Sequence, residues 1–561
     1  MSQDDSMGRA RHRMEALRAS LEATGGEPVR LIETHISWVL LAGALAYKLK
    51  KPVRLPFLDF TTLAARRRFC AEELRLNRRL APSLYLDVVD VRDGPAGPMF
   101  GGDGPVIDAA VRMRRFRDGA LWSEMLAAGA LEPHHVDAMA RRLSTFHREA
   151  DVAPPGSAFG SAAVHERVMR RLIDAVESGP STGSNRSDWP ALRAWLERQL
   201  HVLEPLWDAR RCAGRVRECH GDLHLANVLQ LDGEATAFDG IEFDAELRWI
   251  DVLDDMAFLA TDLLAHGQRA LALRFVNAYL ESGGDYDGLP GLRFHMVCRA
   301  LVRSQVAAIS AGQGAPSSAA RCGAGGYLAL AVTLSRCDDP RLAITHGLPG
   351  SGKTFTSQGM LEAAGAIRVR SDVERKRLFG LHALQSSREH VPGGIYDEPA
   401  TRRTYARLHD VARVALGAGW PVIVDAAFLR RSERAAFAAL AATEAVPYAI
   451  VDCRAPSTLL RRRLEERQSR GGDASEADAS VLERLLAADE PLDEIECTRT
   501  IVADADQPTP AATLAQRWLA LGCPAIDSTA DGSFAEGQFA RSGRSCGAGP
   551  GSEAGGKANK G

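Results

Sequence analysis

The 561-residue chain lacks a long apolar run and a strong excess of charge of one sign, and its first residues do not have the pattern of a signal peptide. Its longest apolar run extends from Trp38 to Tyr47, which is far too short to span a bilayer as a helix. The polar start, from Met1 to Arg13, has none of the apolar core of a secretory signal. A formal net charge of −3 provides no global basic field, which argues against nucleic acid as the main partner. We therefore predict a cytoplasmic protein that binds neither a membrane nor a nucleic acid.

The ten cysteines are scattered, and no two of them have the C-x-x-C spacing. This pattern predicts reduced thiols, with neither a zinc site nor a disulfide framework. The chain also lacks an internal repeat. After Asp527, apolar periodicity is absent and Gly, Ser and Ala dominate, so we expect residues 527–561 to form a disordered tail.

The strongest motif present is a phosphate-binding loop. Residues 347–354 read G-L-P-G-S-G-K-T, which matches G-x-x-x-x-G-K-[ST] at every fixed position, and the apolar run Leu342 to Thr345 before it predicts a buried strand. In such a loop the backbone N–H groups surround the phosphates, Lys353 reaches the β and γ oxygens, and the Thr354 hydroxyl ligates Mg²⁺. The alternative is a Gly-rich turn with a chance lysine. The predicted nucleotide-binding residues are Gly347, Gly350, Ser351, Gly352, Lys353 and Thr354.

A second cluster of polar residues runs from His220 to Asp239. Protein kinases place a catalytic-loop Asp five residues before an Asn that holds Mg²⁺, and a second metal-binding Asp follows on a nearby strand. Asp222, Asn227 and Asp239 have this order and separation. In this interpretation Asp222 accepts or orients the proton of an attacking hydroxyl, while Asn227 and Asp239 hold the cations. The alternative is a surface turn in which Asp222 and Asn227 cap local backbone.

The segment H-G-D-L-H at residues 220–224, together with Asn227 and Asp239, resembles the Brenner motif and metal site of aminoglycoside phosphotransferases and related choline or homoserine kinases. This resemblance implies the fold of protein kinases. From about Arg30 to about Leu521 the chain also resembles a group of bacterial fusion proteins, described as an aminoglycoside phosphotransferase-like region plus an AAA-type ATP-binding region. The resemblance implies ATP binding but no particular substrate. It is carried by residues 37–41, 47–53, 57–60 and 74–82 and by the C-terminal phosphate-binding loop.

A kinase-like N-lobe requires a strand lysine that binds the nucleotide phosphates and a helix glutamate that pairs with it. Lys48 is our candidate, because it shares a strand face with Ala46 as the V-A-I-K pattern requires. Lys50 lies on the same face and is the alternate. Glu72 and Glu73 both open the following helical segment; we take Glu73 and keep Glu72 as the alternative. A salt-bridged surface hairpin would also explain the lysines.

Two departures from the protein-kinase pattern accompany these residues. Only Gly43 stands where a G-x-G-x-x-G loop is expected, a loop that aminoglycoside-kinase-like proteins also lack. Asp239 is followed by G-I-E-F-D instead of completing D-F-G, so Glu242 and Asp244 are either further metal ligands or solvated acids.

Downstream of the phosphate-binding loop, the apolar stretch from Pro421 ends at Asp425, as a Walker B carboxylate that holds Mg²⁺ requires. A strand that ends in a helix-capping Asp is the alternative. Residues 367–372 resemble the second strand of small-molecule P-loop kinases, where an Asp and a nearby Arg contact the acceptor. Asp372 is therefore a candidate base, and Arg370 or Arg375 a candidate acceptor-binding group.

An arginine-rich helical segment, residues 459–470, precedes Gly471 and Gly472. In adenylate-kinase-like and gluconate-kinase-like enzymes, a mobile lid supplies arginines that stabilise the transferring phosphoryl group. Arg467 and Arg470, which are nearest the glycines, are the lid candidates, and a basic surface face paired with neighbouring glutamates is the alternative. No sensor or arginine-finger pattern of a remodelling ATPase ring is evident.

The breaks in composition predict a multidomain chain of α+β and α/β classes. We expect a leading helical segment (1–27), a protein-kinase-like bilobal region (28–337, with an N-lobe at 28–113 and a helical lobe at 114–337) and a P-loop NTPase domain with a parallel sheet (338–526). The predicted function is a bifunctional phosphotransferase that uses ATP and Mg²⁺ and acts on hydroxyls of small-molecule acceptors. The competing hypothesis is a nucleotide-binding regulatory switch or adaptor, in which one or both domains lack turnover; nothing in the sequence indicates a protein partner.

Overall fold

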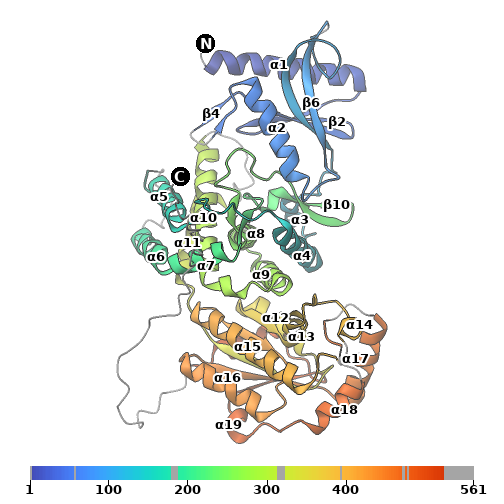
Figure 1. Cartoon of the computed structure of the whole chain (residues 1–561), viewed down its shortest axis with the longest axis vertical. Helices are drawn as coiled ribbons and strands as arrows, with labels where there is room; N and C mark the ends of the chain where they lie inside the picture. Colours follow the sequence, from blue (N-terminus) through green and yellow to red (C-terminus); the bar gives the residue numbers. More distant parts are fainter. Residues whose placement is uncertain are drawn as a thin grey trace, which may run out of the picture. The chain divides into compact units, whose positions relative to one another are not determined.

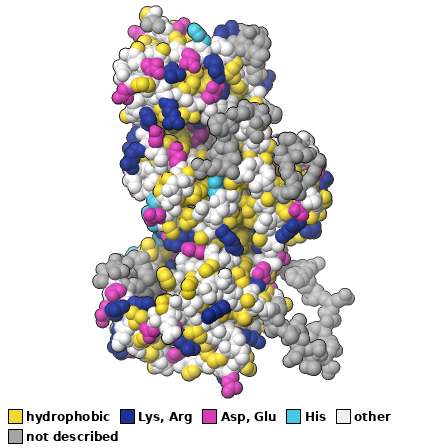
Figure 2. All heavy atoms as spheres, turned by 180° about the vertical axis from the view of Figure 1, so that it is seen from behind, with side chains coloured by type: hydrophobic (Ala, Val, Ile, Leu, Met, Phe, Trp, Pro, Cys, Tyr) yellow, Lys and Arg dark blue, Asp and Glu magenta, His cyan; other side chains and the backbone are white. Residues whose placement is uncertain are grey.

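The computed structural model describes residues 3–55, 58–95, 97–178, 187–312, 322–391, 394–470, 474–476 and 479–522. Residues 1–523 form one compact unit. The predicted disordered tail lies outside the described residues. Among those that are described, no helix combines the length and apolar character needed to cross a membrane. On the face that Figure 2 draws, basic and acidic side chains are interspersed with apolar ones.

The N-terminal part is built on a six-stranded antiparallel sheet with strand order β1-β2-β3-β8-β6-β7. Alternation along β3 sends Tyr47 and Leu49 into a core shared with Met14 of α1, whereas Ala46 packs into a core shared with Cys70 of α2. The helices α1 and α2 thus cover opposite faces of the sheet (Figure 1). The elements are α1 (Gln3–Gly25), β1 (Arg30–Glu33), β2 (Ser37–Ala42), β3 (Leu45–Lys50), β4 (Arg54–Leu55), β5 (Leu58–Asp59), α2 (Leu63–Asn77), β6 (Tyr85–Gly94), β7 (Gly97–Phe100) and β8 (Val106–Arg114).

The following lobe is mainly helical and packs around α8, which is buried along almost its whole length. The polar segment of residues 218–251 includes or adjoins two short antiparallel strand pairs, β10 with β11 and β9 with β12. Residues 179–186, in the Gly/Ser-rich connection, lie outside the described part. The elements are α3 (Trp122–Ala127), α4 (Pro133–Glu149), α5 (Ala162–Ser178), α6 (Trp189–Val202), α7 (Glu204–Cys212), β9 (Val216–Glu218), η2 (Leu225–Asn227), β10 (Val228–Leu231), β11 (Glu234–Ala237), β12 (Trp249–Asp251), α8 (Val252–Ala265), α9 (Arg269–Gly283), η3 (Tyr286–Gly288), α10 (Leu289–Gly312) and α11 (Gly323–Arg336).

The C-terminal part is a five-stranded parallel sheet with strand order β14-β15-β13-β16-β17. Its three central strands, β15, β13 and β16, are buried along almost their whole length because helices cover a parallel sheet on both faces. From β13 the chain continues to β14 on one side of β13, and from β15 it continues to β16 on the other side. Ligands bind at the carboxyl ends of the strands where the strand order reverses in this way.

The elements of this part are β13 (Leu342–His346), α12 (Lys353–Ala364), β14 (Ile367–Arg370), α13 (Ser371–Leu378), α14 (Ser387–His390), α15 (Glu398–Gly417), β15 (Val422–Asp425), α16 (Arg431–Thr443), β16 (Tyr448–Arg454), α17 (Ser457–Arg470), α18 (Ala479–Ala487), α19 (Glu494–Cys497), β17 (Thr500–Asp504) and α20 (Ala511–Leu519). The predicted fold class, a bilobal α+β region followed by an α/β domain with a parallel sheet, is confirmed.

Candidate functional site

The phosphate-binding loop joins β13 to α12, as its sequence predicts. Gly350 and Gly352 have φ values of 84° and 100°, which L side chains rarely adopt. A Cβ atom on Gly347 would lie 2.5 Å from the carbonyl oxygen of Cys453, so only glycine fits there. Lys353 Nζ donates to the carbonyl oxygens of Gly347 and Leu348, each at 2.8 Å. The lysine therefore extends over the loop that would surround a phosphate.

Asp425 ends β15, the strand beside β13, and its side chain is almost fully buried. Its Oδ2 atom accepts a hydrogen bond of 3.1 Å from Ser357 Oγ of α12. Thr354, at the start of α12, lines the same cavity as Asp425. A carboxylate and a hydroxyl that face one cavity next to a phosphate-binding loop suit Mg²⁺, which takes few protein ligands and keeps several waters.

The cavity in front of the loop has a volume of about 750 Å³ and extends from Lys353 to Asp372 of α13. Arg375 also lines it and is held in place, because its Nη1 donates to Ile395 O at 3.0 Å and to Thr401 Oγ1 at 3.1 Å. Glu433 lines the same cavity, and burial raises the pKa of its carboxyl group. The cavity thus joins the phosphate-binding loop to a carboxylate and a fixed guanidinium group.

The arginine-rich helix α17 reaches this cavity through Arg463, whose Nη1 donates to Gly350 O at 3.0 Å. Arg467 and Arg470 lie on the same helix, but their side chains lie outside what the structure describes. Arg463 was not among the predicted lid residues, although it precedes Arg467 by only four residues in the sequence. Neither was Arg484 of α18, which lines the cavity too.

In the N-terminal region, Glu73 of α2 bridges the two candidate lysines of β3. Its Oε1 lies 2.8 Å from Lys48 Nζ and its Oε2 lies 2.7 Å from Lys50 Nζ. Burial alone would raise the pKa of Glu73, but the two ammonium groups lower it to about 2. Glu72 instead pairs with Arg75 and Arg248. Both lysines are therefore internal ion-pair partners, and the surface-hairpin alternative does not describe them.

The two lysines differ in their second partners. Lys48 also pairs with Asp239, whose side chain is 40% exposed, whereas Lys50 also pairs with Glu242, which is 4% exposed. Lys48 thus connects the sheet to the predicted metal-binding carboxylate. Lys50 neutralises two carboxylates that water does not reach.

This difference predicts unequal effects on stability. Replacing Lys50 by Met leaves Glu73 and Glu242 buried with less counter-charge, and we expect the free energy of unfolding to fall by about 3–5 kcal/mol. Replacing Lys48 by Met should cost clearly less, because Asp239 can be solvated. Urea unfolding of the two variants checks this, and equal losses would contradict the assigned difference.

The loop after β9 brings Asp222 and Asn227 together. Asn227 Nδ2 donates to Asp222 O at 2.9 Å and to Asp222 Oδ2 at 3.2 Å, and His224 Nε2 lies 3.4 Å from the same carboxylate oxygen. Burial alone would raise the pKa of Asp222, but His224, Arg303 and His220 lower it below its usual value. The carboxylate is therefore ionised at neutral pH and is suited to orient a hydroxyl.

Asp239 is held in an unusual backbone conformation, with a φ of 63°. Its N–H donates to the Tyr85 hydroxyl at 3.1 Å, and the N–H of Gly240 donates to Asn77 Oδ1 at 2.8 Å. A non-glycine residue in this region costs free energy and persists only where its surroundings impose it. Asn77 and Tyr85 were not found by sequence reasoning, since neither belongs to a motif.

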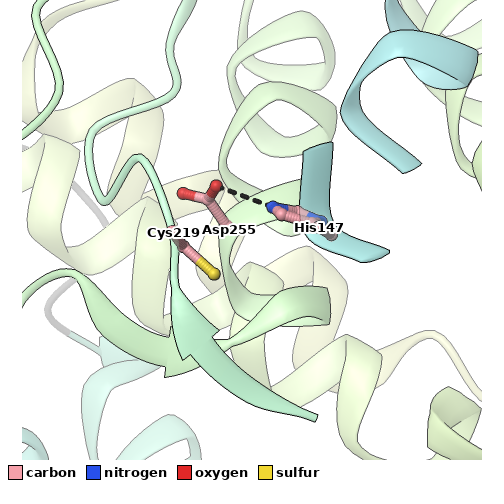
Figure 3. Close-up of side chains that lie close together, drawn as sticks. All are labelled: His147, Cys219 and Asp255. Atoms are coloured by element: carbon pink, nitrogen blue, oxygen red, sulfur yellow. Dashed lines mark hydrogen bonds and ion pairs between the residues drawn. The ribbon is translucent and has the colours of Figure 1, made fainter. Parts of the chain in front are cut away.

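A buried cluster of His147, Cys219 and Asp255 supports this loop (Figure 3). Asp255 accepts hydrogen bonds from the N–H of His220 at 3.1 Å and of Gly221 at 2.8 Å, and His147 Nε2 lies 3.0 Å from its Oδ2. Cys219 Sγ lies 3.6 Å from Ile250 O, and burial raises the pKa of this thiol. The carboxylate is committed to the loop backbone, so we interpret the cluster as a scaffold and not as a metal site.

A family model described as "AAA domain" matches residues 342–492. The uncharacterized protein Rv2004c of Mycobacterium tuberculosis (strain ATCC 25618 / H37Rv) is 32% identical over 469 residues, which cover 81% of this chain and 89% of that protein. The chain belongs to the family of Rv2004c.

Two solved structures with some similarity to this member of the Rv2004c family are kinases by name. A choline/ethanolamine kinase family protein from Mesorhizobium loti is 15% identical, with coverage of 57% of this chain and 99% of that chain and a TM-score of 0.32. A gluconokinase from Sinorhizobium meliloti 1021 is 22% identical, with coverage of 33% and 93% and a TM-score of 0.24. At these TM-scores neither structure adds to what the strand orders show.

The structure thus gathers the predicted residues of this Rv2004c relative into two groups. Gly347, Gly350, Ser351, Gly352, Lys353, Thr354, Asp372 and Asp425 surround or adjoin one cavity. In the N-terminal region, Lys48 pairs with Glu73 and with Asp239, and Asn227 donates to Asp222. Arg370, a candidate acceptor-binding group, instead forms an ion pair with Glu281 at 2.7 Å. The roles of all these residues stay predictions.

Proposed function

We propose that the chain is an ATP-dependent phosphotransferase with two nucleotide sites, one at the phosphate-binding loop and one in the kinase-like region. Both sites would transfer a phosphoryl group to the hydroxyl of a small molecule. The observation that carries the proposal is the cavity that joins Lys353 and Asp425 to Asp372 and Arg375, because it places phosphate-binding, metal-binding and acceptor-side groups around one space. The cytoplasmic location and the absence of nucleic-acid and membrane partners stay predictions.

At the C-terminal site, the loop N–H groups and Lys353 would bind the phosphates, and Thr354 and Asp425 would hold Mg²⁺. The bound cation neutralises charge on the transferring group. Asp372 would accept the proton of the acceptor hydroxyl, and Arg375 would orient the acceptor. Arg463 already contacts the loop at Gly350 and would stabilise negative charge there.

At the N-terminal site, Lys48 would bind the α and β phosphates while Glu73 holds it in place. Asn227 and Asp239 would hold the cation. Asp222, which is ionised and 36% exposed, would orient the attacking hydroxyl.

A second candidate function is that the kinase-like region binds nucleotide without turnover and acts as a switch. The ion pair between Lys48 and Asp239 favours this second function, because in this pair the predicted phosphate-binding group and the predicted metal-binding group contact each other directly. Acceptor-dependent release of ADP, tested with a metabolite library on the full chain, separates the two functions. Nucleotide binding without acceptor-dependent release at the Asp222 site would support the switch.

For the C-terminal site we expect Asp372→Asn to lower acceptor-dependent turnover by about 10²–10⁴-fold, the usual contribution of a general base. Nucleotide affinity should change little, because the carboxylate lies on the acceptor side. Asp410→Asn, at an exposed position of α15, is the matched control and should be neutral. A loss of nucleotide affinity in place of turnover would contradict the role assigned to Asp372.

A further inference from the structure

The helical lobe of the kinase-like region closes the edge of the parallel sheet. Strand β14 is one of the two edge strands of this sheet, and Asn277 of α9 contacts the backbone at its start. Asn277 Nδ2 donates to Ala366 O at 2.9 Å, and its Oδ1 accepts from the N–H of Arg368 at 2.6 Å. The buried amide thus makes the two hydrogen bonds that a neighbouring strand would make.

One turn further along α9, Glu281 reaches two arginines of the same strand. Its Oε1 lies 2.7 Å from Arg370 Nη1, and its Oε2 lies 3.4 Å from Arg368 Nη2. The Glu281 side chain is 17% exposed. Burial alone would raise the pKa of Glu281, but Arg370 and Arg368 lower it. A carboxylate of one region is therefore the counter-charge for two guanidinium groups of the other.

These arginines lead directly to the Mg²⁺ side of the phosphate-binding loop. Arg370 Nε is 3.9 Å from Asp425 Oδ2, at the limit of an ion pair. Arg368 Nη1 donates to Thr354 O at 3.2 Å and to Ser357 Oγ at 3.3 Å, and Ser357 in turn contacts Asp425. The position of Arg370 between Glu281 and Asp425 decides how much positive charge faces the Walker B carboxylate.

We propose that Glu281 is a positioning residue of the phosphate-binding loop site: it draws Arg370 away from Asp425, so that this carboxylate can hold Mg²⁺. The inference rests on the proposed nucleotide binding at this loop. Its physical basis is competition, because a guanidinium group that pairs closely with Asp425 opposes a cation at the same oxygens. The kinase-like region thereby contributes a residue that tunes the second site.

The same helix is tied to the first site. Tyr279, two residues before Glu281, has its hydroxyl 2.8 Å from His147 Nδ1, and His147 contacts Asp255, which holds the backbone of the Asp222 loop. Hydrogen bonds and ion pairs thus extend from that loop through α9 to Asp425.

The test measures Mg²⁺ dependence on the full chain. A non-hydrolysable ATP analogue is titrated at several Mg²⁺ concentrations, and binding at the loop is the part that Lys353→Ala removes. Loss of a group that orients a metal ligand typically weakens metal binding by about 10–100-fold, and we expect Glu281→Gln to raise the half-maximal Mg²⁺ concentration by this factor. Glu281→Gln combined with Arg370→Gln should return it to the wild-type value, since the competing cation is then gone.

The matched control is Glu362→Gln, the same substitution at the same interface, where Glu362 pairs with Arg274 of α9 at 2.9 Å. It should leave the Mg²⁺ dependence unchanged. Arg370→Gln alone should lower or preserve the half-maximal Mg²⁺ concentration, and this holds even if Glu281→Gln does not fold. A raised value for Arg370→Gln, or a wild-type value for Glu281→Gln, overturns the inference, whereas absence of Lys353-dependent binding in the wild type overturns the proposed function itself.

Discussion

Lys353→Ala is expected to weaken ATP binding at the phosphate-binding loop by at least about 100-fold, because charge-assisted hydrogen bonds to phosphate contribute about 1.5–3 kcal/mol each. The ammonium group lies over the loop, where it donates to the carbonyl oxygens of Gly347 and Leu348. A phosphate at the loop would accept from it in their place. No other lysine lines this cavity among the described residues, and Arg463, which contacts the loop at Gly350, would replace only part of the lost charge.

Titration of the full chain with a non-hydrolysable ATP analogue measures this effect. The internal control is the binding that depends on Asp239, which should persist in the Lys353→Ala variant. If the variant keeps wild-type affinity for two nucleotides, the loop has no nucleotide-binding role.

Asp222→Asn is expected to lower turnover in the kinase-like region by about 10²–10⁴-fold, the range for loss of a positioned acid–base group. The amide keeps the size of the side chain and its contact with Asn227, so ground-state binding should be nearly unchanged. The neighbours His224, Arg303 and His220 lower the pKa of Asp222, so the charge that the substitution removes is present throughout the neutral range.

Steady-state kinetics with the acceptor found in the library screen provide the measurement, and the drop should appear in kcat with KM conserved. Asp232→Asn is the matched control, since Asp232 lies 68% exposed at the turn of the nearby β10–β11 hairpin. A rise in KM with unchanged kcat would show that Asp222 binds the acceptor without assisting its reaction.

The phosphate-binding loop could be predicted completely because its chemistry comes from consecutive residues. The glycines, Lys353 and Thr354 lie close together in the sequence. To form the loop they need only the strand before them and the helix after them. Asp425 followed from the same logic, since parallel strands align their carboxyl ends at one edge of the sheet.

The arrangement of the candidate site in the N-terminal region could be predicted only in part, because its residues meet through tertiary structure. The alternation of β3 placed Lys48 and Lys50 on one face but could not tell which carboxylate each would reach. Only the packing of α2 brings Glu73, and not Glu72, into contact with the lysines. Only the position that residue 239 takes in the fold gives Lys48 a different second partner from Lys50.

The residues of α9 gave no signal in the sequence. Asn277 and Glu281 look like ordinary polar positions of an amphipathic helix, and their partners on and just before β14 are 87 to 91 residues away. An ion pair between residues so far apart in the sequence depends on how two regions of the chain pack together, and no local sequence pattern predicts this packing.

The number of nucleotides bound per chain tests the two-site account most directly. Calorimetric titration with a non-hydrolysable ATP analogue and Mg²⁺ should give two per chain for the wild type and one for each of Lys353→Ala and Asp239→Asn. A wild-type value of one that Asp239→Asn leaves unchanged would contradict the account, because the kinase-like region would then bind no nucleotide.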